Sequence, residues 1–149
     1  MISNGKFYES QFEEATIELL REAHWQYAFG DDIHRKNTDP LIEEDLRNFL
    51  AVQYKDKNLT TSEMDSIVAN LRNTGGQNDY YALRNTFLLY RDGYDFAYSD
   101  GRSNPFRLEY IDFEHPDHNI FRCVNQFVME QGRENRRPDI LLFINGIPV

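Results

Sequence analysis

The sequence predicts an α/β fold in which a helical first half packs on a mixed β-sheet built mainly from the second half. Apolar residues recur at helical spacing up to about residue 89, and from residue 106 onward they alternate or form short runs typical of strands. The 149 residues contain no internal repeat and no linker rich in Pro, Gly or Ser. We therefore expect one domain over residues 1–149.

Four helices are predicted in the first half. Ser10, followed three residues later by Glu13, is typical of a capping box and predicts a helix over about 11–24. Asp39-Pro40 is expected to begin a second helix that ends near Tyr54, with acidic residues in its first turn. The remaining two are expected to begin at Thr60 or Thr61, ending at Gly75-Gly76, and to span about 79–89.

Strands are predicted at 25–29 and, in the second half, within 106–111, 120–129 and 139–144. Asn145-Gly146 follows the last strand directly and predicts a tight hairpin, since both residues tolerate the positive φ of a type I′ turn. Only three residues follow this turn, which would leave the strand without most of its partner. On this ground we expect the chain to be a fragment of a longer protein.

Composition and charge limit the possible functions. The net charge of −9 repels phosphate backbones, although a local arginine cluster or a basic partner could overcome it. The lone Cys123 excludes an intramolecular disulfide and thiolate metal sites, and is expected to be a small buried apolar residue. Without a signal peptide or a run of ~20 apolar residues, we expect a cytoplasmic protein with no membrane partner.

Asp139 is the first candidate for chemistry. It follows Pro138 at the start of the apolar strand 140–144, where a rigidly held carboxylate can coordinate a hard divalent cation. The alternative is that Asp139 only solvates the start of the strand after a Pro turn. The Asn145-Gly146 hairpin favours the metal interpretation, because it would bring a further strand beside Asp139.

The segment 136–149, with sequence RRPDILLFINGIPV, resembles the nuclease core of the restriction (R) subunit of type I restriction–modification enzymes. In that family a Pro-Asp at a strand start and an Asn-Gly turn precede an apolar strand that ends in Glu-x-Lys. The similarity also includes Asp92-Gly93, Ile111-Asp112-Phe113 and the segments 12–20, 24–27 and 119–127.

The resemblance implies a restriction-endonuclease-like core and a PD-(D/E)xK nuclease that cleaves DNA with Mg²⁺. Asp139 would be the metal ligand and Glu13 the helix carboxylate of the site, although the capping box alone accounts for a glutamate at position 13 and is the favoured explanation of it. The Glu-x-Lys would lie beyond Val149, so the isolated chain is expected to be inactive. The resemblance further implies an ATP-driven translocase elsewhere in the parent protein, and methylation and specificity subunits as partners.

Four further residues are candidates for DNA contact. Gln126 could reach a phosphate or a base, or could simply face solvent. Arg133, Arg136 and Arg137 could bind the DNA backbone. They could also belong to a solvated loop in which Glu130 and Glu134 are their partners.

Other motifs give weaker signals. His115-x-x-His118 has metal-like spacing but no evident third ligand, which favours a surface loop. Residues 74–78 are Gly-rich without the Gly-Lys-Ser/Thr of a phosphate loop, which favours a helix end. Two other functions stay open: an interaction module whose acidic helical half docks a partner subunit and, less favoured, a small-molecule hydrolase that would lack a nucleophile elbow.

Overall fold

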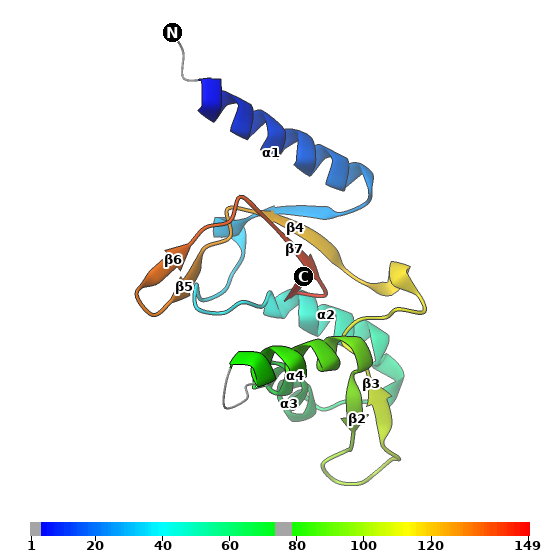
Figure 1. Ribbon diagram of the computed structural model, residues 1–149. Coiled ribbons are helices and arrows are strands. Elements are labelled where there is room, and N and C mark those ends of the chain that lie inside the picture. The colour runs from blue at the N-terminus through cyan, green and yellow to red at the C-terminus, as the bar shows by residue number, and fades with distance from the viewer. Residues whose placement is uncertain (1–3, 74–78) are drawn as a thin grey trace. The chain divides into compact units, whose positions relative to one another are not determined.

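The computed structural model describes residues 4–73 and 79–149, which fold as two compact units. Unit 1 combines Met1–Ile42 with Ile120–Val149, and unit 2 comprises Glu43–Asn119. Both contain helices and strands, which confirms the predicted α/β class (Figure 1). The Gly-rich segment 74–78 lies outside the described residues.

Unit 1 joins a long helix to the main sheet and a small hairpin. Its elements are α1 (Asn4–Glu22), β1 (Gln26–Phe29), the 3₁₀ turn η1 (Gly30–Asp32), β4 (Phe121–Asn125), β5 (Met129–Gln131), β6 (Glu134–Arg136), β7 (Ile140–Ile144) and β8 (Ile147–Pro148). The four predicted strand regions all contain strands, and the region 120–129 holds both β4 and the start of β5.

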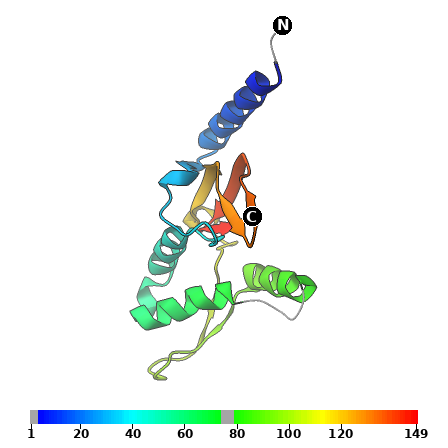
Figure 2. The ribbon, with the colours of Figure 1, turned by 90° about the vertical axis from the view of Figure 1, so that its left-hand side faces the viewer.

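The main sheet has the strand order β1-β4-β7-β8. Strand β4 runs parallel to β1, with Phe29 opposite Asn125, and antiparallel to β7, with Asn125 opposite Ile140. The ends of β1 and β4 and the beginning of β7 therefore meet at one edge of the sheet. Figure 2 shows β4 and β7 side by side in this unit. This edge carries the candidate site.

The Asn145-Gly146 hairpin is confirmed. Strand β8 returns antiparallel to β7, and Asn145 and Gly146 have φ values of 52° and 76°. Asn145 is fully buried and also ties the turn to the start of β4: its side-chain Oδ1 accepts a hydrogen bond from the Ile120 amide at 2.7 Å. An Asn here thus satisfies both the backbone geometry and a buried donor.

The core of unit 1 lies under the middle of the sheet. Val124 and Phe143 come from β4 and β7, and Phe127 and Ile42 come from the adjoining loops. The rings of Phe127 and Phe143 lie 4.9 Å apart in a tilted arrangement, which suits aromatic packing. Cys123 is fully buried in β4, as expected for a small apolar residue.

Unit 2 packs three helices with a two-stranded sheet. Its elements are α2 (Glu43–Gln53), η2 (Lys55–Lys57), α3 (Thr61–Arg72), α4 (Asp79–Asp92), β2 (Tyr94–Phe96), β3 (Phe106–Leu108) and η3 (Pro116–His118). The capping box of α3 is present: Thr60 Oγ1 accepts from the Glu63 amide at 3.1 Å, and Glu63 Oε1 accepts from the Thr60 amide at 3.0 Å.

Tyr110 organises the core of unit 2. Its side chain is fully buried, and its hydroxyl donates to the carbonyl oxygen of Ile67 at 2.6 Å. Burial raises the pKa of Tyr110 well above its usual value, so the hydroxyl stays a donor. Leu46, Leu50 and Leu108 are likewise fully buried.

Two predicted helix starts are wrong. The chain is already helical at Asn4, so Ser10 lies inside α1 and is not its N-cap. Helix α2 begins at Glu43 rather than at Asp39-Pro40, because the buried residues Leu41 and Ile42 belong to an extended segment that hydrogen-bonds to Gly146. None of the helices in the described ranges is both long and apolar enough to cross a bilayer.

Candidate functional site

Asp139 lies where β7 begins, with its side chain exposed. Its backbone is fixed by β4: the carbonyl oxygen of Asp139 accepts from the Gln126 amide at 3.1 Å and from Asn125 Nδ2 at 3.3 Å. The carboxylate therefore projects from a rigid sheet edge while remaining accessible. This is the arrangement that the Pro-Asp motif predicts.

Glu13 and Asp139 converge on the same amide group. Nε2 of Gln126 lies 3.3 Å from Asp139 Oδ1 and 3.4 Å from Glu13 Oε1. Three of the candidate residues chosen from sequence thus lie together, although they are separated by up to 126 positions in the chain. Two carboxylates beside one amide form a group of oxygen ligands suited to a hard cation.

Glu13 owes its position to tertiary contacts and not to helix capping. It lies in the interior of α1, and Asn125 Nδ2 donates a hydrogen bond to Glu13 Oε1. The capping-box explanation for this glutamate is therefore excluded. Its carboxylate is directed to the end of β4, where the strand stops pairing with β1.

Gln126 adopts a left-handed backbone conformation, with φ of 58°. Such a conformation is uncommon for residues other than glycine, and it ends β4 abruptly. The backbone of Gln126 packs closely against Gly30, where there is no side chain. A Cβ at position 30 would lie 2.7 Å from the Gln126 carbonyl carbon. The glycine is thus required where the two strand ends meet.

Arg35 contacts Phe127 and Val128, the two residues that follow Gln126 in the turn after β4. Its guanidinium lies over the Phe127 ring, 3.4 Å from the centroid, and donates to the carbonyl oxygens of Val128 and, at 2.7 Å, Asp39. Burial lowers the pKa of Arg35, and Asp39 partly offsets this effect. Arg35 thereby fixes the turn that presents Gln126.

The arginine cluster lies on and after the β5–β6 hairpin. Arg133 occupies the exposed turn, and Arg136 forms an ion pair with Glu134 at 3.4 Å. Arg137 pairs with Asp31 at 3.4 Å, which links the cluster to the η1 turn at the same sheet edge. These exposed pairs are weak, so the side chains stay available to a phosphate backbone.

Sequence reasoning missed one group of potential metal ligands. Asp112, His115 and His118 each offer one ligand atom, and these atoms all lie within 4.8 Å of one another. The third ligand that His115-x-x-His118 appeared to lack is the aspartate three residues upstream. The spacing Asp-x-x-His-x-x-His is the signal that could have found it.

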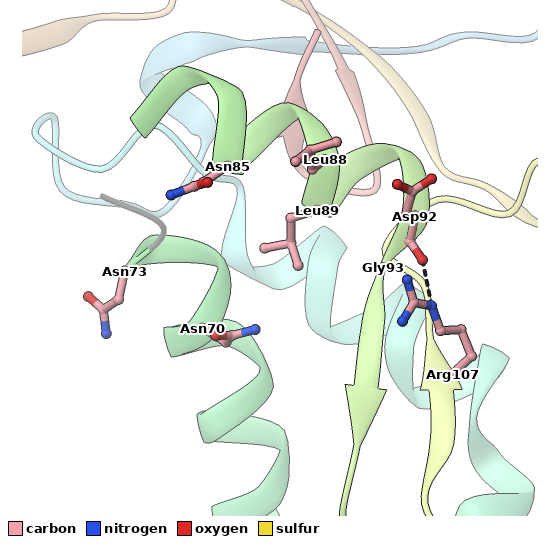
Figure 3. A pocket seen from close by; sticks show the side chains of 8 residues that line it. All are labelled: Asn70, Asn73, Asn85, Leu88, Leu89, Asp92, Gly93 and Arg107. Carbon is pink, nitrogen blue, oxygen red and sulfur yellow. Dashed lines mark hydrogen bonds between the residues drawn. The ribbon is translucent and has the colours of Figure 1, made fainter. Parts of the chain in front are cut away.

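A separate pocket of about 430 Å³ lies in unit 2, between α3, α4 and the start of β3 (Figure 3). Arg107 spans its wall, where Nε donates to the Asp92 carbonyl oxygen at 2.8 Å. Asparagine amides and leucines form most of its lining: Asn70, Asn73, Asn85, Leu88, Leu89, Asp92, Gly93 and Arg107. The lining contains a single carboxylate, whereas the sheet edge of unit 1 brings two together.

Comparison with protein families matches residues 6–149 to the type I restriction enzyme R protein N terminus. The chain belongs to this family. It is 30% identical over 152 residues to the type I restriction enzyme HindI endonuclease subunit of Haemophilus influenzae, and 27% identical over 145 residues to the putative type I restriction enzyme MjaIXP endonuclease subunit of Methanocaldococcus jannaschii. These alignments cover 95% and 92% of the chain.

The chain spans 14% of the length of each of these two relatives. No solved structure matches it. The range matched by the family includes Glu13, Gln126, Asp139 and the arginine cluster. Every candidate residue of the sheet edge therefore lies inside it.

Proposed function

We propose that the chain is the nuclease region of a type I restriction R subunit and contributes to Mg²⁺-dependent phosphodiester cleavage of DNA. The observation that supports this proposal best is the convergence of the Glu13 and Asp139 carboxylates on the Gln126 amide. Membership of the R-protein family makes a nuclease the function expected of such a pair.

The residues at the sheet edge suit a hard divalent cation. Asp139 is exposed and Glu13 is half-buried, and both carry oxygen ligands of the kind that Mg²⁺ prefers. Asp139 and Glu13 would hold the ion. When bound, Mg²⁺ would stabilise charge on a phosphate and lower the pKa of a coordinated water.

The chain's own residues have four separate tasks in this proposal. Asp139 and Glu13 bind the cation, and Asn125 orients Glu13 through its side-chain amide. Gln126 holds the two carboxylates together and could turn its amide toward a phosphate or a base. The arginines at 133, 136 and 137 would bind the DNA backbone, with electrostatic attraction strong enough locally to offset the net charge of −9.

The proposed set of catalytic residues is incomplete in these 149 residues. No glutamate of the sequence is followed two positions later by lysine, so the Glu-x-Lys of the resemblance does not occur. We therefore expect the isolated chain to bind a divalent ion without cleaving DNA or hydrolysing ATP. Cleavage would require the parent protein with its ATP-driven translocase, together with methylation and specificity subunits, in the cytoplasm.

The experiment that tests this function uses the assembled restriction enzyme with Mg²⁺ and ATP. Asp139→Asn and Glu13→Gln should each reduce DNA cleavage by at least about 100-fold, the upper range for loss of a residue near a bound metal, and leave ATP hydrolysis intact. Asp32→Asn and Glu14→Gln are the controls: each removes an exposed carboxylate, one from the η1 turn and one from α1 next to Glu13. Normal cleavage by both site variants would contradict the proposal.

An interaction module is the second candidate, and one observation favours it. Phe12 and Leu19 of α1 are 71% and 66% exposed and lie seven positions apart, which puts both on one side of the helix where a partner could cover them. In that case Phe12→Ser with Leu19→Ser would abolish assembly with partner subunits, whereas Asp139→Asn would leave cleavage unchanged. The nuclease proposal predicts the opposite result for Asp139→Asn.

A further inference from the structure

We propose that Asp112, His115 and His118 form a binding site for a transition-metal ion of the Zn²⁺ type. The three residues lie in the loop that follows β3, within unit 2. This site is separate from the proposed nuclease residues, which all lie in unit 1, and does not depend on the proposed function.

The ligand atoms of Asp112, His115 and His118 all lie within 4.8 Å of one another. Asp112 Oδ2 lies 3.0 Å from His118 Nδ1 and 3.5 Å from His115 Nδ1. Ligands at the 2.0–2.2 Å distances that Zn²⁺ prefers are about 3.3 Å apart at the edge of a tetrahedron. The two imidazole rings stack, with centroids 4.9 Å apart and an interplanar angle of 19°, and the Nδ1 atoms of both rings lie near the same carboxylate oxygen.

Of the three ligand atoms, His115 Nδ1 is the one held most weakly by hydrogen bonding. Asp112 Oδ2 already accepts from Gln53 Nε2 at 2.8 Å and is within hydrogen-bonding distance of His118 Nδ1. At 3.5 Å, His115 Nδ1 is at the limit of hydrogen-bonding distance and faces an oxygen that already has two partners. A cation held between the oxygen and both nitrogens would give His115 Nδ1 a close partner.

Asp112 is fixed as a ligand before any ion binds. Its side chain is buried, and Oδ1 accepts from the amides of Glu114 at 3.1 Å and His115 at 2.9 Å. Gln53, which donates to Oδ2 at 2.8 Å, is the outer partner that metal-binding carboxylates usually have.

The histidines leave the site open. The side chains of His115 and His118 are 60% and 50% exposed, so each ring can turn to direct its nitrogen lone pair at an ion. One carboxylate and two imidazoles select Zn²⁺, Ni²⁺ or Cu²⁺ over Mg²⁺, which prefers oxygen ligands. A fourth position would be left for water or for a ligand from outside the chain.

The test is calorimetric titration of the 149-residue chain, stripped of metal with a chelator, with Zn²⁺ alone. The double variant His115→Asn/His118→Asn should lose the binding of one Zn²⁺ per chain. His24→Asn/His34→Asn is the matched control, because it removes the other two of the four histidines and should bind as the wild type does. Gln53→Leu should weaken binding by roughly 10- to 100-fold, as loss of an outer partner does.

The failure of this proposal can be distinguished from failure of the nuclease proposal. Asp139→Asn should not change Zn²⁺ affinity if the ion binds at Asp112. The cobalt-substituted chain should show the visible absorption of a nitrogen-ligated ion, and the His115→Asn/His118→Asn variant should not. Equal Zn²⁺ affinity in the wild type and this variant, or affinity that follows Asp139 instead, would overturn the proposal.

Discussion

Gln126 and Asp139 are joined twice, once through the backbone and once through the side chains. The Gln126 amide donates to the Asp139 carbonyl oxygen at 3.1 Å, and its side-chain Nε2 lies 3.3 Å from Asp139 Oδ1. The last pairing of β4 with β7 therefore also fixes the carboxylate at the start of β7. Changes that disturb the Gln126 turn should affect the proposed cation site even when they leave its carboxylates in place.

Gly30→Ala should disturb this turn most directly. A methyl group there would meet the Gln126 carbonyl carbon at 2.7 Å and the Phe127 Cα at 3.0 Å, and both are backbone atoms with little freedom to move. We expect a loss of about 1–3 kcal/mol in the free energy of unfolding, measured with urea, as is typical for overpacking. Divalent-ion binding should weaken as well.

Gly132→Ala is the matched control for Gly30→Ala in the same unit. No atom lies within 4 Å of its added Cβ, so only its φ of 61° causes strain, with a cost of about 1 kcal/mol. Ion binding should then be unchanged. An equal loss of ion binding in both variants would contradict the positioning role of the Gly30 contact.

The arginine cluster should control how strongly DNA binding depends on salt concentration. Replacing Arg133, Arg136 and Arg137 by Ala should reduce the slope of log Kobs against log [salt] by up to about 0.9 for each phosphate that an arginine no longer neutralises. The measurement is fluorescence anisotropy of a labelled duplex at low salt. Arg47→Ala, which breaks surface ion pairs in unit 2, should leave the slope unchanged. If Arg47→Ala and the triple arginine variant changed the slope equally, the arginine cluster would have no specific role in DNA binding.

Glu63 should make unit 2 sensitive to acid. The Arg102 guanidinium, at 2.6 Å, and the Thr60 amide lower the pKa of Glu63 from 4.5 to about 2. Its contribution to stability is therefore complete above about pH 4.5 and is lost as the pH falls toward 2. Urea unfolding at a series of pH values should show a weaker pH dependence in Glu63→Gln than in the wild type.

The exposed Glu114 provides the control for this pH dependence. Glu114→Gln should retain the acid sensitivity of the wild type, because it is the backbone amide of Glu114, unchanged by the substitution, that donates to Asp112. If Glu63→Gln lost as much stability at low pH as the wild type, the ion pair between Glu63 and Arg102 would not be the cause of the acid sensitivity.

The N-cap of α3 should contribute measurably to stability. Thr60→Ala removes the side-chain acceptor of the Glu63 amide and should lower the free energy of unfolding by about 1 kcal/mol. Thr61→Ala, at the first helical position, should have a smaller effect, since alanine is a good helix former. If Thr61→Ala lowered the free energy of unfolding more than Thr60→Ala, the N-cap would be Thr61.

Features set by local chemistry were predictable from the sequence. The Asn145-Gly146 turn is present as predicted, and of the two predicted caps, Thr60 and Thr61, Thr60 is the N-cap of α3. The Ser10–Glu13 pair has the same pattern and is not a cap, because α1 already includes the residues before it. A local motif does not reveal whether the helix continues upstream.

The arrangement of the site required tertiary information. Resemblance and residue type selected Glu13, Gln126 and Asp139, but the strand order β1-β4-β7-β8 is what brings the ends of β4 and β7 together. The Asp112 group was missed for a different reason: the sequence placed Asp112 in a family-like segment, so it was not considered together with His115 and His118, beside which the loop after β3 places it.

The claim that Glu13 and Asp139 form one cation site is tested most directly by Mn²⁺ titration of the 149-residue chain, followed by the electron paramagnetic resonance signal of free Mn²⁺. We predict that Asp139→Asn and Glu13→Gln each weaken binding by at least about tenfold, whereas Asp32→Asn and Glu14→Gln bind as the wild type does. Mg²⁺ should compete with Mn²⁺ for the same site. Unchanged Mn²⁺ affinity in both Asp139→Asn and Glu13→Gln would contradict the claim.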